Sequence, residues 1–202
     1  GIDREVVDVM HRTNMGVAAD YKSKVLGGMR SALAEGWGGS MIATDLQDVL
    51  FGTPQPVRAD VNLGVLRDDA VNVLLHGHEP ALAEAIVDVA NEPEMLEKAR
   101  ELGADGINIA GICCTANEVL MRRGLPIAGN FLQQELAVTT GAVESILIDV
   151  QCIMPGVTQA ADCFHTEVIA TSEQAFYPGT VHIGFEAGNA YESAREIVGR
   201  AV

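Results

Sequence analysis

The chain has 202 residues, of which 48% are apolar, 20% charged and 4% aromatic, a composition typical of a folded domain and not of a disordered segment. Its 13 basic and 28 acidic residues give a net charge of −15, which argues against a nucleic-acid binder and against attachment to anionic lipid. No run approaches the roughly 18 apolar residues of a membrane span, and no secretory signal is visible, so we expect a cytoplasmic protein. Because the chain opens on Gly1 and stops on a helical pattern, we expect a piece of a longer chain.

The first part of the chain is predicted to be helical. Apolar residues recur at helical spacing over residues 2–10, and Asp20 can cap a second helix that ends at Gly36. The run Trp37–Gly38–Gly39 predicts a break, after which Ser40 caps a third helix that closes at Gly52. Prolines then interrupt the chain at residues 53–56. We therefore divide the sequence into a helical lead-in, residues 1–66, and an α/β domain, residues 67–202.

Strand-like and helix-like segments alternate through the second part. The predicted strands cover residues 71–75, 107–112, 145–150, 166–171 and 181–185. The predicted helices follow Pro80, Glu92, a capping-box-like run at residues 115–118, Asn130, Pro155 and Gly188. This alternation predicts a parallel sheet with right-handed helical crossovers.

Histidine and cysteine follow three successive predicted strands. His76 and His78 end the first strand, Cys113 and Cys114 end the second, and Cys152 ends the third. Ligands of open α/β sheets bind at the carboxyl ends of the strands, where helix N-termini also favour thiolates. Thiolate and imidazole donors suit zinc, iron–sulfur or nickel–iron–sulfur centres and not magnesium or calcium. The sequence therefore predicts a soft metal site at this edge from the joint placement of these residues, although a single cysteine there is more often core packing and a single histidine more often a turn residue.

Other candidates are weaker. We interpret Cys163 and His165 as structural, and His11 and His182 have no ligand-like partner in the sequence. The chain has no C-x-x-C pair, no Walker A motif, no G-x-S-x-G elbow and no complete dinucleotide fingerprint.

Longer motifs around these residues resemble one family. The motifs are G-H-E-P at residues 77–80, G-I-C-C-T-A-N-E-V-L-M-R at 111–122 and D-V-Q-C-I-M-P at 149–155. They resemble the catalytic subunit of the nickel-dependent carbon monoxide dehydrogenases, and N-F-L-Q-Q-E at 130–135 resembles the form that partners acetyl-CoA synthase. Two lead-in runs match the same family, H-R-T-N-M-G at residues 11–16 and G-W-G-G-S-M-I-A-T-D-L-Q-D at residues 36–48.

The resemblance implies a Rossmann-like α/β domain that carries part of a nickel–iron–sulfur C-cluster. His78, Cys114 and Cys152 would be metal ligands, Cys113 would lie beside them or bind in an alternative cluster state, and His76 would support the site or pack. The family interconverts CO and CO2 with water, two protons and two electrons. It forms a homodimer, passes electrons to ferredoxin and in some forms partners acetyl-CoA synthase. Its [4Fe–4S] clusters and remaining C-cluster ligands belong to parts of the subunit absent here, so the chain alone should be inactive.

Two alternatives remain open at this point. The hybrid-cluster proteins belong to the same superfamily and reduce hydroxylamine or nitrogen oxyanions, but their cluster motifs differ from G-I-C-C-T-x-N-E. In the other alternative the chain is a scaffold domain with inert thiols. A metal site requires His78, Cys114 and Cys152 to face one space, with Cys113 close by.

Overall fold

The computed structural model describes residues 1–14, 17, 20–114 and 119–202, so the predicted helix start at residues 115–118 lies outside the described residues. The chain forms two compact units, Gly1–Pro54 and Gln55–Val202. We divided the sequence at residue 66, whereas residues 55–66 belong to the second unit. They belong there because Asn62 N–H donates to the Ile127 carbonyl and Ile127 N–H donates to the Asp60 carbonyl, at 3.1 and 3.0 Å.

The first unit is helical, as predicted. Its helices are α1 (Ile2–Thr13), α2 (Tyr21–Ala34), a π-helical turn η1 (Glu35–Ser40) and α3 (Met41–Phe51). Asp20 caps α2 by accepting a hydrogen bond from Ser23 N–H at 2.8 Å, and Gly52 ends α3 with a φ of 82°.

The predicted break at residues 37–39 is wrong, because η1 joins α2 to α3 in one helical run. Glycine costs about 1 kcal/mol in a helix but does not forbid one, and a π turn accommodates an extra residue. Ser40 has helical backbone angles and its hydroxyl donates to Glu35 Oε1 at 3.1 Å, so it is not an N-cap. Gly38 lets α1 approach, because a Cβ there would lie 2.8 Å from the Ile2 side chain.

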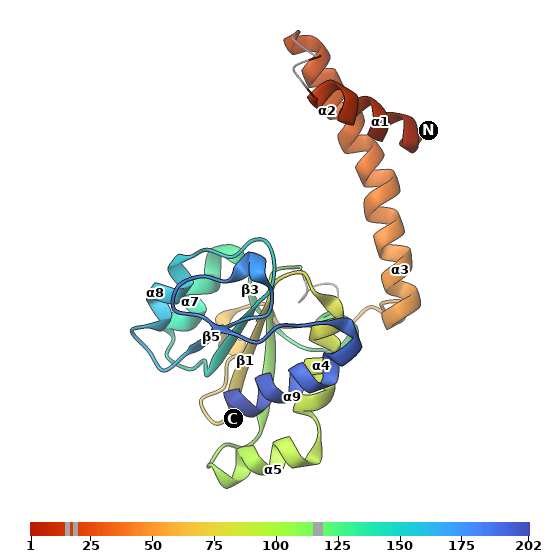
Figure 1. The fold of residues 1–202 in the computed structure, drawn as a ribbon. Coiled ribbons are helices and arrows are strands. Elements are labelled where there is room, and N and C mark those ends of the chain that lie inside the picture. The colour runs from red at the N-terminus through yellow and green to blue at the C-terminus, as the bar shows by residue number, and fades with distance from the viewer. Residues whose placement is uncertain (15–16, 18–19, 115–118) are drawn as a thin grey trace. The chain divides into compact units, whose positions relative to one another are not determined.

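A six-stranded parallel sheet forms the second unit (Figure 1). The strands are β1 (Val71–His76), β2 (Ile107–Ile112), β3 (Ile127–Gly129), β4 (Ser145–Ile148), β5 (Glu167–Ala170) and β6 (Val181–His182). Their order across the sheet is β3-β2-β1-β4-β5-β6, and every pair is parallel. The predicted α/β class is therefore confirmed. β3 is not among the predicted strands, because three residues are too short to show strand periodicity.

Helices cover both faces of the sheet. They are α4 (Pro80–Ala90), α5 (Pro93–Glu101), α7 (Gln134–Thr139), α8 (Gly156–Ala161) and α9 (Ala190–Ala201). Short 3-10 turns occur at Leu63–Val65, Leu120–Arg123, Phe131–Gln133, Glu173–Ala175 and Ala187–Asn189. Helices α4 and α9 pack together on one face, and α7 and α8 on the other (Figure 1).

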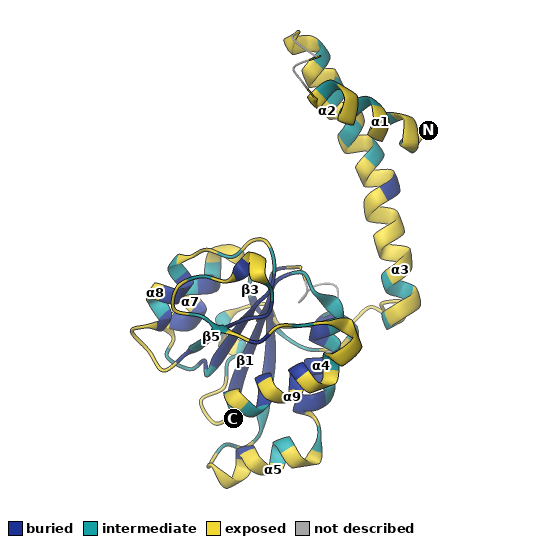
Figure 2. Ribbon diagram, in the orientation of Figure 1, coloured by how far each residue is buried: buried dark blue, intermediate teal, exposed yellow. Residues whose placement is uncertain are grey.

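The apolar core lies in the second unit. The six residues of β1 are all buried, and the sheet carries the dark core seen in Figure 2. In the first unit Gly38 is the only buried residue among those described. Across the described ranges, none of the helices combines the length and apolarity that crossing a bilayer requires.

Candidate functional site

The three loops that carry the candidate ligands meet at one edge of the sheet. β1 lies between β2 and β4, and its last residue, His76, pairs with Ile112 on one side and Ile148 on the other. The three strands therefore end at the same level. The chain order reverses between β1 and β4, and ligands of such sheets bind where this reversal opens a crevice.

Asp149, which follows β4, holds the loop after β1 in place. Its carboxylate accepts hydrogen bonds from His78 N–H, at 2.7 and 2.9 Å, and from Glu79 N–H at 2.8 Å, and it also accepts from Val150 N–H. Gly77 makes this contact possible, because a Cβ there would lie 1.7 Å from Asp149 Oδ1. The carboxylate and the glycine together fix the backbone that carries His78.

The His78 ring is oriented by the loop after β4. Its Nδ1 lies 2.8 Å from the Val150 carbonyl oxygen. A carbonyl only accepts, so Nδ1 carries a proton, and in the neutral ring Nε2 then has the lone pair. Metal-binding histidines are held in this way, with one ring nitrogen donating to a carbonyl and the other free to bind.

The cysteines lie in the neighbouring loops. Cys113 is buried, whereas Cys114 and Cys152 are exposed. Burial, with the Cys152 and Cys114 thiols close by, raises the pKa of Cys113 to about 11. The structure thus brings the thiol of the loop after β2 near the thiol of the loop after β4.

Backbone strain is concentrated in these same loops. Among the described residues, three that are not glycine have a positive φ: Cys113 at 70°, Gln151 at 59° and Cys152 at 57°. The left-handed region costs such residues about 1–2 kcal/mol each. Strain of this kind persists where the surroundings enforce it, and it clusters at functional sites.

His76 occupies a different environment from His78. It is 2% exposed, and its Nε2 lies 3.1 Å from Oε1 of the buried Gln134. Burial lowers the pKa of His76, although the hydrogen bond with Gln134 opposes this shift. The His76 ring is therefore buried in the domain and is held by Gln134.

The donor set fits a soft metal–sulfur group. His78 offers a free Nε2, and Cys114 and Cys152 offer exposed thiols. Within the ranges that the structure describes, however, no three His, Cys, Asp or Glu side chains are grouped as they would be around a single metal ion. The convergence of His78, Cys114 and Cys152 on one centre therefore stays a prediction.

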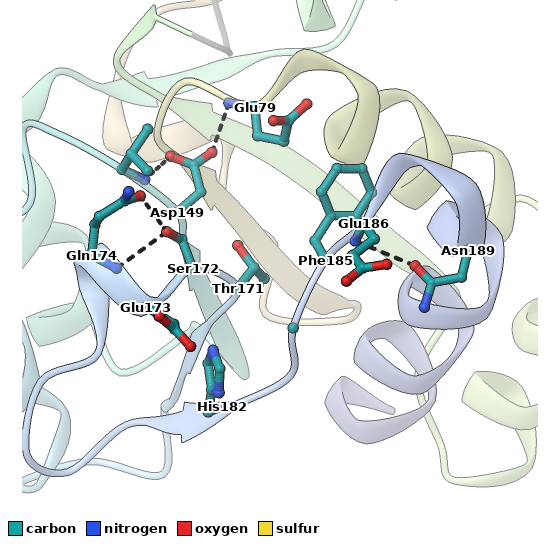
Figure 3. Close-up of a pocket in the computed structure, with 12 residues that line it drawn as sticks. Glu79, Asp149, Thr171, Ser172, Glu173, Gln174, His182, Phe185, Glu186 and Asn189 are labelled. Carbon is teal, nitrogen blue, oxygen red and sulfur yellow. Dashed lines mark hydrogen bonds between the residues drawn. The ribbon is translucent and has the colours of Figure 1, made fainter.

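A polar cavity of about 510 Å³ lies beside Asp149 (Figure 3). Its lining includes Glu79, Asp149, Thr171, His182 and Glu186. Burial raises the pKa of Glu79, which also caps α4 by accepting from Ala81 N–H at 3.2 Å. None of the described cysteines lines this cavity. Asp149 thus lines the cavity and also holds the loop that carries His78.

Each of His182, His165 and Cys163 contacts a residue outside the loops that carry Cys113, Cys114 and Cys152. His182 packs against Phe176, with ring centroids 5.1 Å apart, and lines the cavity. His165 is exposed and lies 3.4 Å from Glu144, and the exposed Cys163 thiol contacts the Gln159 carbonyl at 3.7 Å. His11 is exposed on α1.

Fold and site together define a Rossmann-ordered α/β domain whose sheet edge presents thiols and an imidazole. The chain matches the Prismane/CO dehydrogenase family over residues 1–202, and it belongs to that family. Carbon monoxide dehydrogenase 1 of Methanosarcina mazei is 61% identical over the whole chain and the beta subunit of the Moorella thermoacetica carbon monoxide dehydrogenase/acetyl-CoA synthase is 46% identical.

Solved structures give the same result. A nickel-free carbon monoxide dehydrogenase from Thermococcus sp. AM4 superposes on the whole chain with a TM-score of 0.91 and 55% identity. The chain covers 32% of that protein, 32% of the Methanosarcina relative and 30% of the Moorella relative. It therefore spans about a third of the length of the proteins it matches. The resemblance inferred from the motifs is confirmed.

Proposed function

We propose that the chain forms part of an oxidoreductase that interconverts CO and CO2, CO + H2O = CO2 + 2 H+ + 2 e−, at a nickel–iron–sulfur cluster. One observation carries the proposal: the strained, thiol-bearing backbone at Cys113, Gln151 and Cys152 lies at the sheet edge where the His78 Nε2 is left free. This arrangement occurs in a chain homologous over its full length to carbon monoxide dehydrogenases.

Each residue has a distinct part in this proposal. His78 would bind iron through Nε2, while its Nδ1–H stays on the Val150 carbonyl. A neutral imidazole adds no negative charge to the site. Cys114 and Cys152 would bind as thiolates, and Cys113, whose thiol is protonated at neutral pH, would lie beside them or bind in another cluster state. When bound, the cluster supplies the redox centre that takes up the two electrons.

The wider assembly is part of the same proposal. The rest of the subunit would supply the remaining cluster ligands and the [4Fe–4S] clusters, the subunit would form a homodimer, and ferredoxin would accept the electrons. A role beside acetyl-CoA synthase is supported by the 46% identity to the beta subunit of the Moorella thermoacetica enzyme that carries both names.

The two histidines provide the test. In the full-length protein, His78→Ala should abolish CO-dependent dye reduction and lower the iron content, because it removes the free Nε2. His76→Ala should keep a normal nickel and iron content, because His76 is buried with its Nε2 on Gln134 and would pack or support the site without binding metal. Metal analysis and dye reduction of both variants decide the assignment. A fully active His78→Ala enzyme would show that His78 is not a ligand.

A further inference from the structure

We infer that Gln134 is a positioning residue that holds the turn carrying Cys152. Gln134 is the first residue of α7 and is fully buried, although glutamine side chains mostly lie on protein surfaces. The inference rests on the proposed function, since it assumes that Cys152 serves as a cluster ligand. It assigns a task to a side chain that lies 18 residues from Cys152 in the sequence.

The Gln134 amide connects three segments. Its Oε1 accepts a hydrogen bond from Met154 N–H at 2.9 Å and lies 3.1 Å from Nε2 of His76 at the end of β1. Its Nε2 donates to the Phe131 carbonyl at 2.5 Å and approaches the Cys152 carbonyl at 3.4 Å. The amide therefore contacts the backbone at Cys152 and again two residues later.

The orientation of this amide is determined by its partners. Met154 N–H can only donate and the Phe131 carbonyl can only accept, so Oε1 must face Met154 and Nε2 must face Phe131. With this orientation Oε1 also accepts from His76 Nε2–H. The bonds to Met154 and Phe131 fix the amide without His76, so the support of the turn comes from Gln134 itself.

The turn requires such support. Gln151 and Cys152 are consecutive non-glycine residues in the left-handed region, and both side chains are exposed. Burial of these side chains therefore cannot stabilise the turn, and backbone hydrogen bonds have to hold it. Gln134 supplies one such bond at Met154 and a longer contact at Cys152.

Exchange of backbone amides in the metal-free, full-length protein tests the inference without relying on activity. Gln134→Met is nearly isosteric but removes the hydrogen bonds, so the peptide covering residues 151–157 should exchange at least about fivefold faster. A peptide covering β2 should be unchanged. Gln159→Met, on the exposed surface of α8, is the matched control and should leave both peptides as in the parent protein.

Metal content gives the second readout. After cluster assembly, Gln134→Met should hold less than about half of the nickel and iron of the parent protein. The reason is that a Cys152 thiol whose position is no longer fixed binds metal more weakly. Gln134→Glu keeps an acceptor for Met154 N–H but places its second oxygen against the Phe131 and Cys152 carbonyls, so it should restore only part of the exchange protection and part of the metal. If Gln134→Met does not fold, Gln134→Asn replaces it, because its amide is one methylene too short to reach Met154.

The outcomes separate the two proposals. Unchanged exchange at residues 151–157, or a full metal content in Gln134→Met, overturns the positioning role of Gln134. Cys152→Ser, measured in parallel, tests the ligand assignment itself. A Cys152→Ser protein with full nickel and iron overturns the proposed function at this residue, whatever the exchange of the Gln134 variants.

Discussion

At the scale of single residues, the buried thiol of Cys113 makes a testable prediction. Burial and the neighbouring thiols raise its pKa to about 11, so at pH 8 only roughly one thiol in a thousand is a thiolate. In metal-free protein we expect iodoacetamide to modify Cys113 at least about tenfold more slowly than the exposed Cys163. Mass spectrometry of the modified peptides over time measures both rates.

The rate at which iodoacetamide modifies Cys113 should increase with pH. Because the thiolate fraction rises about tenfold per pH unit below the pKa, the Cys113 rate should keep rising from pH 8 to about pH 11. A Cys113 rate that already levels off near pH 9 would contradict the raised pKa.

Local motifs name His78, Cys114 and Cys152 as candidate ligands, an assignment that stays a prediction, but no local motif names the residues that position them. His78, Cys114 and Cys152 follow strands, and their motifs are local. From the sequence, Asp149 is predicted to lie at the end of a strand and Gln134 inside a helix, and neither prediction indicates a role at the site. The Asp149 contact with His78 spans 71 residues, and the Gln134 contact with His76 spans 58. Contacts over such separations depend on strand order, which no local pattern contains.

At the scale of elements, the turn from β1 into α4 depends on the absence of a side chain at Gly77. A Cβ there would lie 1.7 Å from Asp149 Oδ1, so Gly77→Ala must push the carboxylate off the backbone N–H groups of His78 and Glu79. We expect a loss of about 2–4 kcal/mol in the free energy of unfolding. Urea denaturation of the chain measures it.

Gly28→Ala is the matched control for that substitution. Gly28 lies inside α2, and a Cβ there would meet no atom within 4 Å. Alanine favours the helix over glycine by about 1 kcal/mol, so this variant should be as stable as the parent or slightly more stable. If both variants lost the same free energy of unfolding, the close approach of Gly77 to Asp149 would not explain the loss in Gly77→Ala.

Helices and strands were predictable to different degrees. Long amphipathic helices and buried strands have a clear periodicity, and all but one of the strands lie where the sequence placed them. The glycines at residues 36, 38 and 39 misled the prediction, because the helix continues through a π turn that sequence propensity disfavours. β3 forms because β2 offers it a free edge, and this information is tertiary.

At the scale of the whole molecule, metal analysis of the anaerobically purified full-length protein distinguishes the three functional classes. We expect both nickel and iron, since the donor set is soft and the chain belongs to the Prismane/CO dehydrogenase family. Iron without nickel would favour a hybrid-cluster protein, and neither metal would favour a scaffold with inert thiols. Assembly in the presence of nickel and iron, followed by desalting, controls for loss during purification.

The two compact units should differ in resistance to proteases. Gly38 is the only buried residue described in Gly1–Pro54, and large apolar side chains there are exposed, Leu33 at 74% and Val49 at 82%. All of the buried apolar side chains described lie between Ala70 and Val198. A segment with so little burial opens locally at a low free-energy cost, whereas a core opens only with the domain. Thermolysin should therefore cut the 202-residue chain first within residues 1–54, leaving a stable product that begins near Gln55. Mass spectrometry of the early products tests this, and first cuts within β1 or β4 would contradict it.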